Sequence, residues 1–88
     1  MQDAIPNHLN EVERLAGLMF NVFEVGLITG LDPATEGDAF ERAMLRGRLR
    51  EEAELRKSVF ELAKAGSAPA QTLAKQFIDQ ARVAAAGA

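Results

Sequence analysis

The sequence NVFEVGLITGLDP, residues 21–33, contains both ends of one short helix and the start of the next. Asn21 is followed three residues later by a glutamate, and this spacing predicts a capping box at a helix N-terminus. Gly30 can adopt the left-handed conformation that ends many helices. Asp32 is a helix-capping residue type, and Pro33 suits the first position of a helix. We therefore predict a short helix, a sharp turn at Gly30, and a new helix that opens at Pro33.

Apolar residues recur at helical spacing on both sides of this stretch, and no segment alternates as a β-strand does. Four helices are predicted: one that begins near Asn7, one over residues 22–29, one from Pro33 as far as Ala65, and one that begins at Pro69. Gly37 and Gly47 interrupt the third helix, and each marks either a bend or a close helix contact.

The expected fold is therefore all-α: a four-helix small domain with an N-terminal helix-turn-helix and a long third helix that packs on a C-terminal helix. Residues 1–82 are predicted to form a single domain. Within it, residues 7–45 are the helix-turn-helix-like part and residues 46–82 a helical hairpin, although a plain hairpin fits the caps of the first part equally well. Residues 83–88 are rich in alanine and lie at the chain end, so we expect a disordered tail.

Composition excludes several function classes. The chain has 88 residues, no cysteine and one histidine, His8, so it has no disulfide and no thiolate metal site. Its carboxylates are scattered over predicted helix surfaces, and no nucleophile–base pair, metal-ligand spacing or phosphate-binding loop is present. No apolar run approaches the ~20 residues that span a bilayer. We expect a cytoplasmic, non-enzymatic protein with no catalytic residue, metal, cofactor or membrane partner.

The charge is divided unequally along the chain. Residues 1–41 contain eight acidic side chains and one basic one, whereas residues 42–88 contain five acidic and nine basic ones. Such a division can orient a partner in an electric field, or it can be neutralised within the fold itself.

Basic residues cluster on the predicted third helix, where a helix-turn-helix would place its recognition helix. Arg42, Arg46 and Arg50 recur every four residues and could contact successive phosphates of duplex DNA. They could equally pair with the neighbouring Glu51, Glu52 and Glu54. The predicted DNA-binding residues are Thr35, Arg42, Arg46, Arg48 and Arg50.

The last predicted helix carries an apolar stripe. Leu73, Phe77 and Ala81 recur at spacings of four residues and share one helix face. We expect this stripe to form an interface with a partner or between copies of the chain.

Short motifs along residues 40–77 suggest a family. They are Arg46-Gly47-Arg48, Leu62-Ala63-Lys64-Ala65-Gly66 and Leu73-Ala74-Lys75. In this order, after a helix-turn-helix, they resemble the helical segment of phage terminase small subunits and related prophage DNA-packaging proteins. The resemblance implies a non-enzymatic homo-oligomer that binds viral double-stranded DNA in the host cytoplasm and presents it to the large terminase subunit.

A second function fits the acidic N-terminal half better. Glu36, Asp38 and Glu41 lie early in the predicted recognition helix, where they would repel phosphates. The alternative is a small acidic helical protein-interaction module, an adaptor or inhibitor, that binds a protein instead of DNA. A purely structural oligomerisation domain is a third hypothesis.

Overall fold

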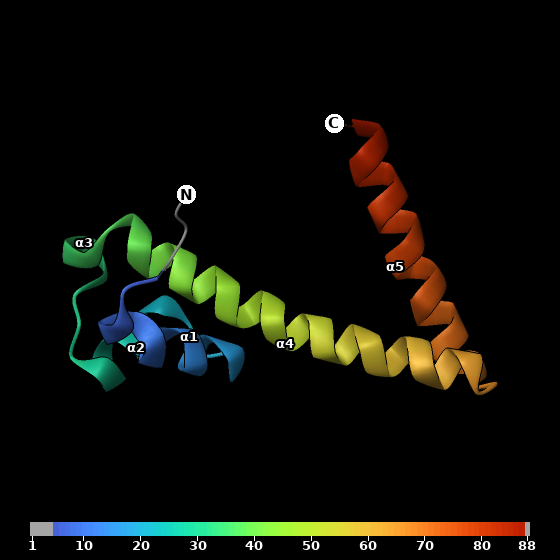
Figure 1. Ribbon diagram of the computed structural model, residues 1–88, viewed down its shortest axis with the longest axis horizontal. Helices are drawn as coiled ribbons and strands as arrows, with labels where there is room; N and C mark the ends of the chain where they lie inside the picture. The colour runs from blue at the N-terminus through green and yellow to red at the C-terminus, as the bar shows by residue number, and fades with distance from the viewer. Residues whose placement is uncertain (1–4, 88) are drawn as a thin grey trace. The chain divides into compact units, whose positions relative to one another are not determined.

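The computed structural model describes residues 5–87, with side chains up to residue 85, and all regular structure in this range is helical, as predicted (Figure 1). Its elements are a 3-10 turn η1 (Asn7–Leu9) and the helices α1 (Asn10–Gly17), α2 (Val22–Thr29), α3 (Pro33–Glu36), α4 (Asp38–Lys64) and α5 (Ala68–Gly87). The chain divides into two compact units, Met1–Glu52 and Ala53–Ala88, which we call unit 1 and unit 2. The division falls within α4, several residues after the boundary predicted between residues 45 and 46.

The ends of α2 agree with the prediction. The Asn21 side chain accepts a hydrogen bond from the Glu24 backbone N–H (2.8 Å), and the Glu24 carboxylate accepts one from the Asn21 N–H (3.0 Å). Gly30 ends the helix with a φ of 76°, in the left-handed region. Asp32 then caps the next turn by accepting a hydrogen bond from the N–H of Ala34.

Residues 5–87 form five α-helices, whereas the sequence predicted four. The difference lies at Gly37, whose φ of 66° and ψ of −141° are incompatible with an α-helix. The predicted third helix is therefore divided into the single turn α3 and the long α4. At the other glycine, Gly47, α4 continues without a break.

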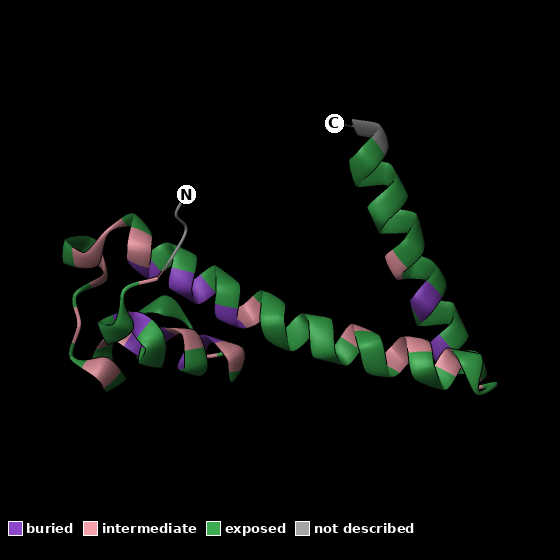
Figure 2. Cartoon of the chain, viewed as in Figure 1, coloured by how far each residue is buried: buried purple, intermediate pink, exposed green. Residues whose placement is uncertain are grey.

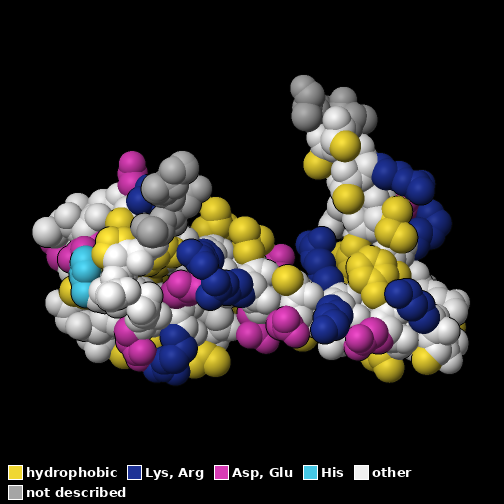
Figure 3. Space-filling model, viewed as in Figure 1, with side chains coloured by type: hydrophobic (Ala, Val, Ile, Leu, Met, Phe, Trp, Pro, Cys, Tyr) yellow, Lys and Arg dark blue, Asp and Glu magenta, His cyan; other side chains and the backbone are white. Residues whose placement is uncertain are grey.

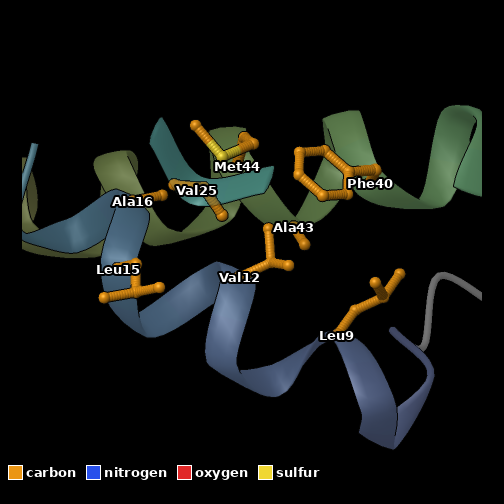
Figure 4. Close-up of a cluster of buried hydrophobic side chains, with 8 residues drawn as sticks. All are labelled: Leu9, Val12, Leu15, Ala16, Val25, Phe40, Ala43 and Met44. Atoms are coloured by element: carbon orange, nitrogen blue, oxygen red, sulfur yellow. The ribbon is translucent and has the colours of Figure 1, made fainter. Parts of the chain in front are cut away.

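Unit 1 contains a fully packed hydrophobic core (Figure 4). Its buried side chains come from η1, α1, α2 and the first half of α4, and they are Leu9, Val12, Leu15, Ala16, Val25, Phe40, Ala43 and Met44. The partly buried Ile5, Phe20, Leu31 and Ala39 surround it. The apolar stripes of α1 and α4, with Val25 of α2 and Leu9 of η1, thus close a common centre.

Gly47 allows α1 and α4 to cross at very short range. A Cβ atom at Gly47 would lie 2.0 Å from the carbonyl oxygen of Glu13, and one at Gly17 would lie 3.3 Å from the carbonyl oxygen of Gly47. No other residue type has space at Gly47, so this glycine marks a close helix contact and not a bend.

Unit 2 is a helical hairpin made of the end of α4 and α5. Gly66, with a φ of 107°, turns the chain, and the N–H of Ser67 donates to the carbonyl of Leu62 (3.0 Å). Among the described side chains of unit 2 only Ala70 and Ala74 are buried, and most of α5 is exposed (Figure 2).

The C-terminal end of α5 differs from the sequence prediction. Residues 83–87 are helical in the structure, where a disordered tail was expected, and residue 88 lies outside the described residues. Alanine has the highest helix propensity of all residues, which accounts for the extension.

Candidate interaction surfaces

Two of the predicted DNA-binding arginines are held by one carboxylate of α1. Arg50 Nη1 lies 2.6 Å from Glu13 Oε2, and Arg46 Nε lies 3.5 Å from the same oxygen. The Glu13 side chain is only 14% exposed beneath them. These arginines therefore tie α4 to α1 beside the Gly47 crossing, and their partner is not one of the glutamates of α4 that the sequence suggested.

The other three residues predicted to contact DNA are Arg48, Thr35 and Arg42, and the structure places each in a different environment. Arg48 Nη2 donates to the carbonyl of Phe20 (3.4 Å), in the connection between α1 and α2. The Thr35 hydroxyl donates to the Asp32 carboxylate (2.9 Å), so it takes part in the cap of α3. Arg42 is exposed, and within the described residues no ion pair or hydrogen bond engages it. Of the five predicted DNA contacts, Arg42 alone has no ion pair or hydrogen bond to another of the described residues.

The largest apolar feature of unit 1 was missed by the sequence analysis. Six apolar side chains that follow one another through the α1–α2 connection and along α2 are exposed, with Phe23 at 73% and Leu27 at 68%. We call this set the apolar α2 surface; its members are Leu18, Met19, Val22, Phe23, Leu27 and Ile28. Exposed apolar side chains that gather in one region of a protein mark interaction sites.

A signal for this surface was present in the sequence. Seven of the eight residues of α2 are uncharged, and Glu24 is the exception. A helix that is apolar on all sides is normally covered on all sides. Only Val25 of α2 is buried in unit 1, so the outer side of the helix lacks the cover that its composition predicts.

Met19 adds a second observation at the same surface. Its φ is 72°, the one positive value among the non-glycine residues described here, and its N–H donates to the carbonyl of Ala16 (2.9 Å). The left-handed conformation costs a residue with a Cβ about 1–2 kcal/mol, and glycine would avoid that cost. Met19 lies where α1 ends, and its N–H and that of Phe20, which donates to the carbonyl of Leu15 (3.4 Å), close the left-handed turn that ends many helices.

Two further polar pairs lie on unit 1. His8 Nε2 lies 2.7 Å from Glu36 Oε1 and connects η1 to α3. On α1, Arg14 donates to Glu11 (Nε to Oε1, 2.9 Å), and this hydrogen bond lowers the pKa of the Glu11 carboxyl and raises that of the Arg14 guanidinium. Both pairs are at the surface and belong to no larger cluster.

The predicted interface on α5 is divided by the structure. The Phe77 ring packs inside unit 2, with its centroid 6.2 Å from that of Phe60 and the Arg56 guanidinium 4.5 Å above it. Leu73 and Ala81 are exposed. Phe77 therefore serves the hairpin itself, whereas Leu73 and Ala81 of the same stripe remain exposed.

Among the described residues, no group of three or more His, Asp or Glu side chains could hold a metal ion. None of the helices in residues 5–87 is long and apolar enough to cross a membrane. Comparisons of the chain with protein-family models, with curated proteins and with solved structures find no match.

Proposed function

We propose that this chain is a small helical protein-interaction module that binds a protein partner through the apolar α2 surface. The observation that carries the proposal is the exposure of six apolar side chains in the α1–α2 connection and α2, on a unit that has a buried core of its own. Unit 1 has no need of this surface for folding. Leaving it in water is unfavourable, and a partner that covers it gains the free energy of apolar burial.

The charges of unit 1 favour a protein over DNA as the partner. Residues 1–52 contain ten acidic and five basic side chains, and three of the arginines of α4 are engaged by Glu13 or by the Phe20 carbonyl. Duplex DNA would meet net repulsion there. A partner with apolar side chains in a basic surrounding would be attracted.

The test compares two exposed leucines of unit 1, one on the proposed surface and one on α4. The tagged chain is purified from its source cells under nuclease treatment, and the partner is identified, expressed and titrated. Leu27→Asp should raise the Kd at least tenfold, because it places a charge at the centre of the buried area. Leu45→Asp, at a leucine of α4 that is 58% exposed, should leave the Kd within about twofold. Equal binding by both variants would contradict the proposal, as would a partner that is lost when nucleic acid is removed.

DNA binding of the helix-turn-helix kind is the second candidate, and the exposed, unengaged Arg42 favours it. In that case α2 and the helix after Gly30 would form the helix-turn-helix that binds DNA. The whole chain would then be a DNA-packaging subunit, which oligomerises and presents the DNA to a large terminase subunit. Fluorescence anisotropy with a labelled duplex at about 50 mM salt tests it, since phosphate contacts are strongest there. Arg42→Ala should weaken the binding and reduce the salt dependence by about one phosphate contact. No binding at low salt would exclude this candidate.

A further inference from the structure

Unit 2 buries too little of itself to be stable as a lone hairpin. It consists of two helices, and the only described side chains that it buries are those of Ala70 and Ala74. Its larger apolar residues, such as Phe60 and Phe77, are half-buried. Units of fewer than about 40 residues usually need disulfides, a metal or association with another chain, and this sequence has no cysteine. Association is the device that remains for the residues described here.

The two helices of unit 2 run antiparallel, as the contacts along them show. The Gln71 side chain donates to the carbonyl of Ala63, near the turn, whereas Phe77, further along α5, contacts Phe60 and Arg56, further back on α4. The residues that make these contacts mark the line along each helix that faces the other helix. Successive residues of a helix are about 100° apart around its axis, so every other residue can be assigned to one side of that line or the other.

One broad side of the hairpin carries leucines. Leu55 and Leu62 are seven residues apart, or two helical turns, and lie about a quarter turn from the α5-facing line of α4. They are 57% and 56% exposed. The antiparallel register places the exposed Leu73 of α5 on the same side. We call this the leucine side; its other members are Val59, Gln76 and Gln80, and none of its residues is charged.

The opposite side of the hairpin is basic. The same helical geometry assigns Lys57 and Lys64 of α4 and Lys75 and Arg82 of α5 to it, together with one acidic residue, Glu61, and the exposed Ile78. On the face drawn in Figure 3, the Lys and Arg side chains of unit 2 lie around a group of hydrophobic ones. A charge-free side and a basic side thus lie back to back on a hairpin two helices wide.

We infer that the leucine side of unit 2 packs against the leucine side of unit 2 in a second copy of the chain, which closes a four-helix bundle. Pairing across this side buries no charge and directs the lysines of both copies into solvent, whereas pairing across the basic sides would bring like charges together. Two copies related by a twofold axis present the same side to each other, so one set of leucines suffices for both.

The area available is sufficient for a reversible dimer. A side about two helix diameters wide and 12–20 residues long offers roughly 500 Å² per copy, close to the lower end of stable interfaces. The dimer should therefore dissociate on dilution. The dimer would carry two apolar α2 surfaces and could bind two partner molecules. Only this bivalent binding rests on the proposed function, and the dimer itself does not.

The test measures the mass of the full chain over a concentration series by sedimentation equilibrium. The wild type should pass from 9.5 kDa to twice that mass as concentration rises. Leu55→Glu combined with Leu62→Glu should remain a monomer throughout. The matched control, Lys57→Glu combined with Lys64→Glu, introduces the same two residues on the basic side and should dimerise as the wild type does. A wild type that is monomeric at all concentrations, or a dimer that the leucine variant leaves intact, would overturn the inference.

A second measurement keeps the inference testable if the combined Leu55→Glu and Leu62→Glu variant does not fold. Because the chain has no cysteine, Leu62→Cys introduces a single thiol. Mild oxidation should link two copies through it, since the inference places Leu62 in the interface between the copies, and Lys64→Cys, on the opposite side, should not be linked. Equal linking of both variants would count against the leucine side.

Two variants test the inferred dimer and the proposed function independently of each other. Leu27→Asp, which disables the apolar α2 surface, should leave the dimer unchanged. If it abolished the dimer instead, the copies would be joined through α2 and the inference for unit 2 would be wrong. Conversely, the Leu55→Glu and Leu62→Glu monomer should still bind an identified partner with its single-site Kd.

Discussion

The two units of this chain use similar helices with very different results. In unit 1, η1, α1, α2 and the start of α4 surround a common centre, and eight apolar side chains are buried there. In unit 2, two helices meet along one line and bury two alanines. Two helices can cover only one narrow stripe of each other, whereas a third converts stripes into an enclosed core. A helix's apolar content therefore does not determine its burial, and the uncovered leucines of unit 2 follow from the number of its elements.

The largest expected difference between the units is at their phenylalanines. Phe40 is fully buried in unit 1, so Phe40→Ala should destabilise the protein by about 3–5 kcal/mol. Phe77 is half-buried, and Phe77→Ala should cost roughly half as much. Chemical denaturation followed by circular dichroism measures both. Equal losses would show that unit 2 has a core comparable with that of unit 1.

Gly47→Ala tests the close crossing of α1 and α4. In an isolated helix this change would stabilise by about 1 kcal/mol, because alanine has the higher helix propensity. Here the new Cβ would lie 2.0 Å from the Glu13 carbonyl oxygen, so we expect a loss of about 3 kcal/mol. Ser58→Ala, at an exposed position of the same helix, should change the unfolding free energy by only a few tenths of a kcal/mol. A stabilising Gly47→Ala would mean that the crossing is looser than described.

Met19→Gly should stabilise unit 1 by about 1 kcal/mol, because glycine adopts a φ of 72° without steric cost. The same change at Leu18, whose φ is −87°, relieves nothing and should not stabilise. Thermal melting compares the two variants. If Met19 serves the proposed partner site, the stabilised variant should also bind the partner more weakly. A melting temperature lowered by Met19→Gly would remove the argument from strain.

Glu13→Gln should cost about 1 kcal/mol, because two guanidinium groups lose the charge of a shared, largely covered acceptor while both remain partly solvated. Part of the loss should disappear at high salt, where charge interactions are screened. Urea denaturation at low and high salt measures it, with Glu51→Gln on the exposed side of α4 as the control. Identical unfolding of both variants would show that the arginines are free to act elsewhere.

The smallest expected effect is that of Glu11→Gln. Arg14 holds the pKa of Glu11 below its ordinary 4.5, so the pair stabilises the fold above that pH and this contribution is lost as pH falls through the lowered pKa. The variant should melt slightly below the wild type at about pH 7, and the difference should close at strongly acidic pH. The pair is at the surface, where solvent screens it. A difference that grew in acid would contradict the assigned sign.

Local features were predictable because they depend on neighbours in the chain. The capping box at Asn21, the left-handed Gly30 and the Asp32 cap all involve residues within four positions of one another. The sequence did not reveal that Gly37 adopts a non-helical φ, since a glycine tolerates both helical and left-handed conformations. It offered two meanings for Gly47, and only the position of Glu13 on another helix distinguishes them.

The candidate sites were less predictable, because exposure depends on which helix covers which. Glu13 and Arg50 are 37 positions apart, so no local pattern could pair them. Phe77 was assigned to an interface from its spacing, yet Phe60 and Arg56 cover its ring. The missed α2 surface had a compositional signal, the near absence of charge, but its exposure could be seen only once the core was known.

The amino-acid sequence by itself determined that this chain is helical, where α2 begins and ends, and that its charges are unevenly divided. These properties arise from backbone preferences and from hydrogen bonds within a single turn. Only the tertiary structure decided that Arg46 and Arg50 converge on Glu13, that Gly47 lies at a helix crossing, and that α2 and the leucines of unit 2 are uncovered. These features depend on contacts between segments that are distant in the sequence. Such contacts form only when the apolar faces of different helices pack together, and no local sequence pattern specifies them.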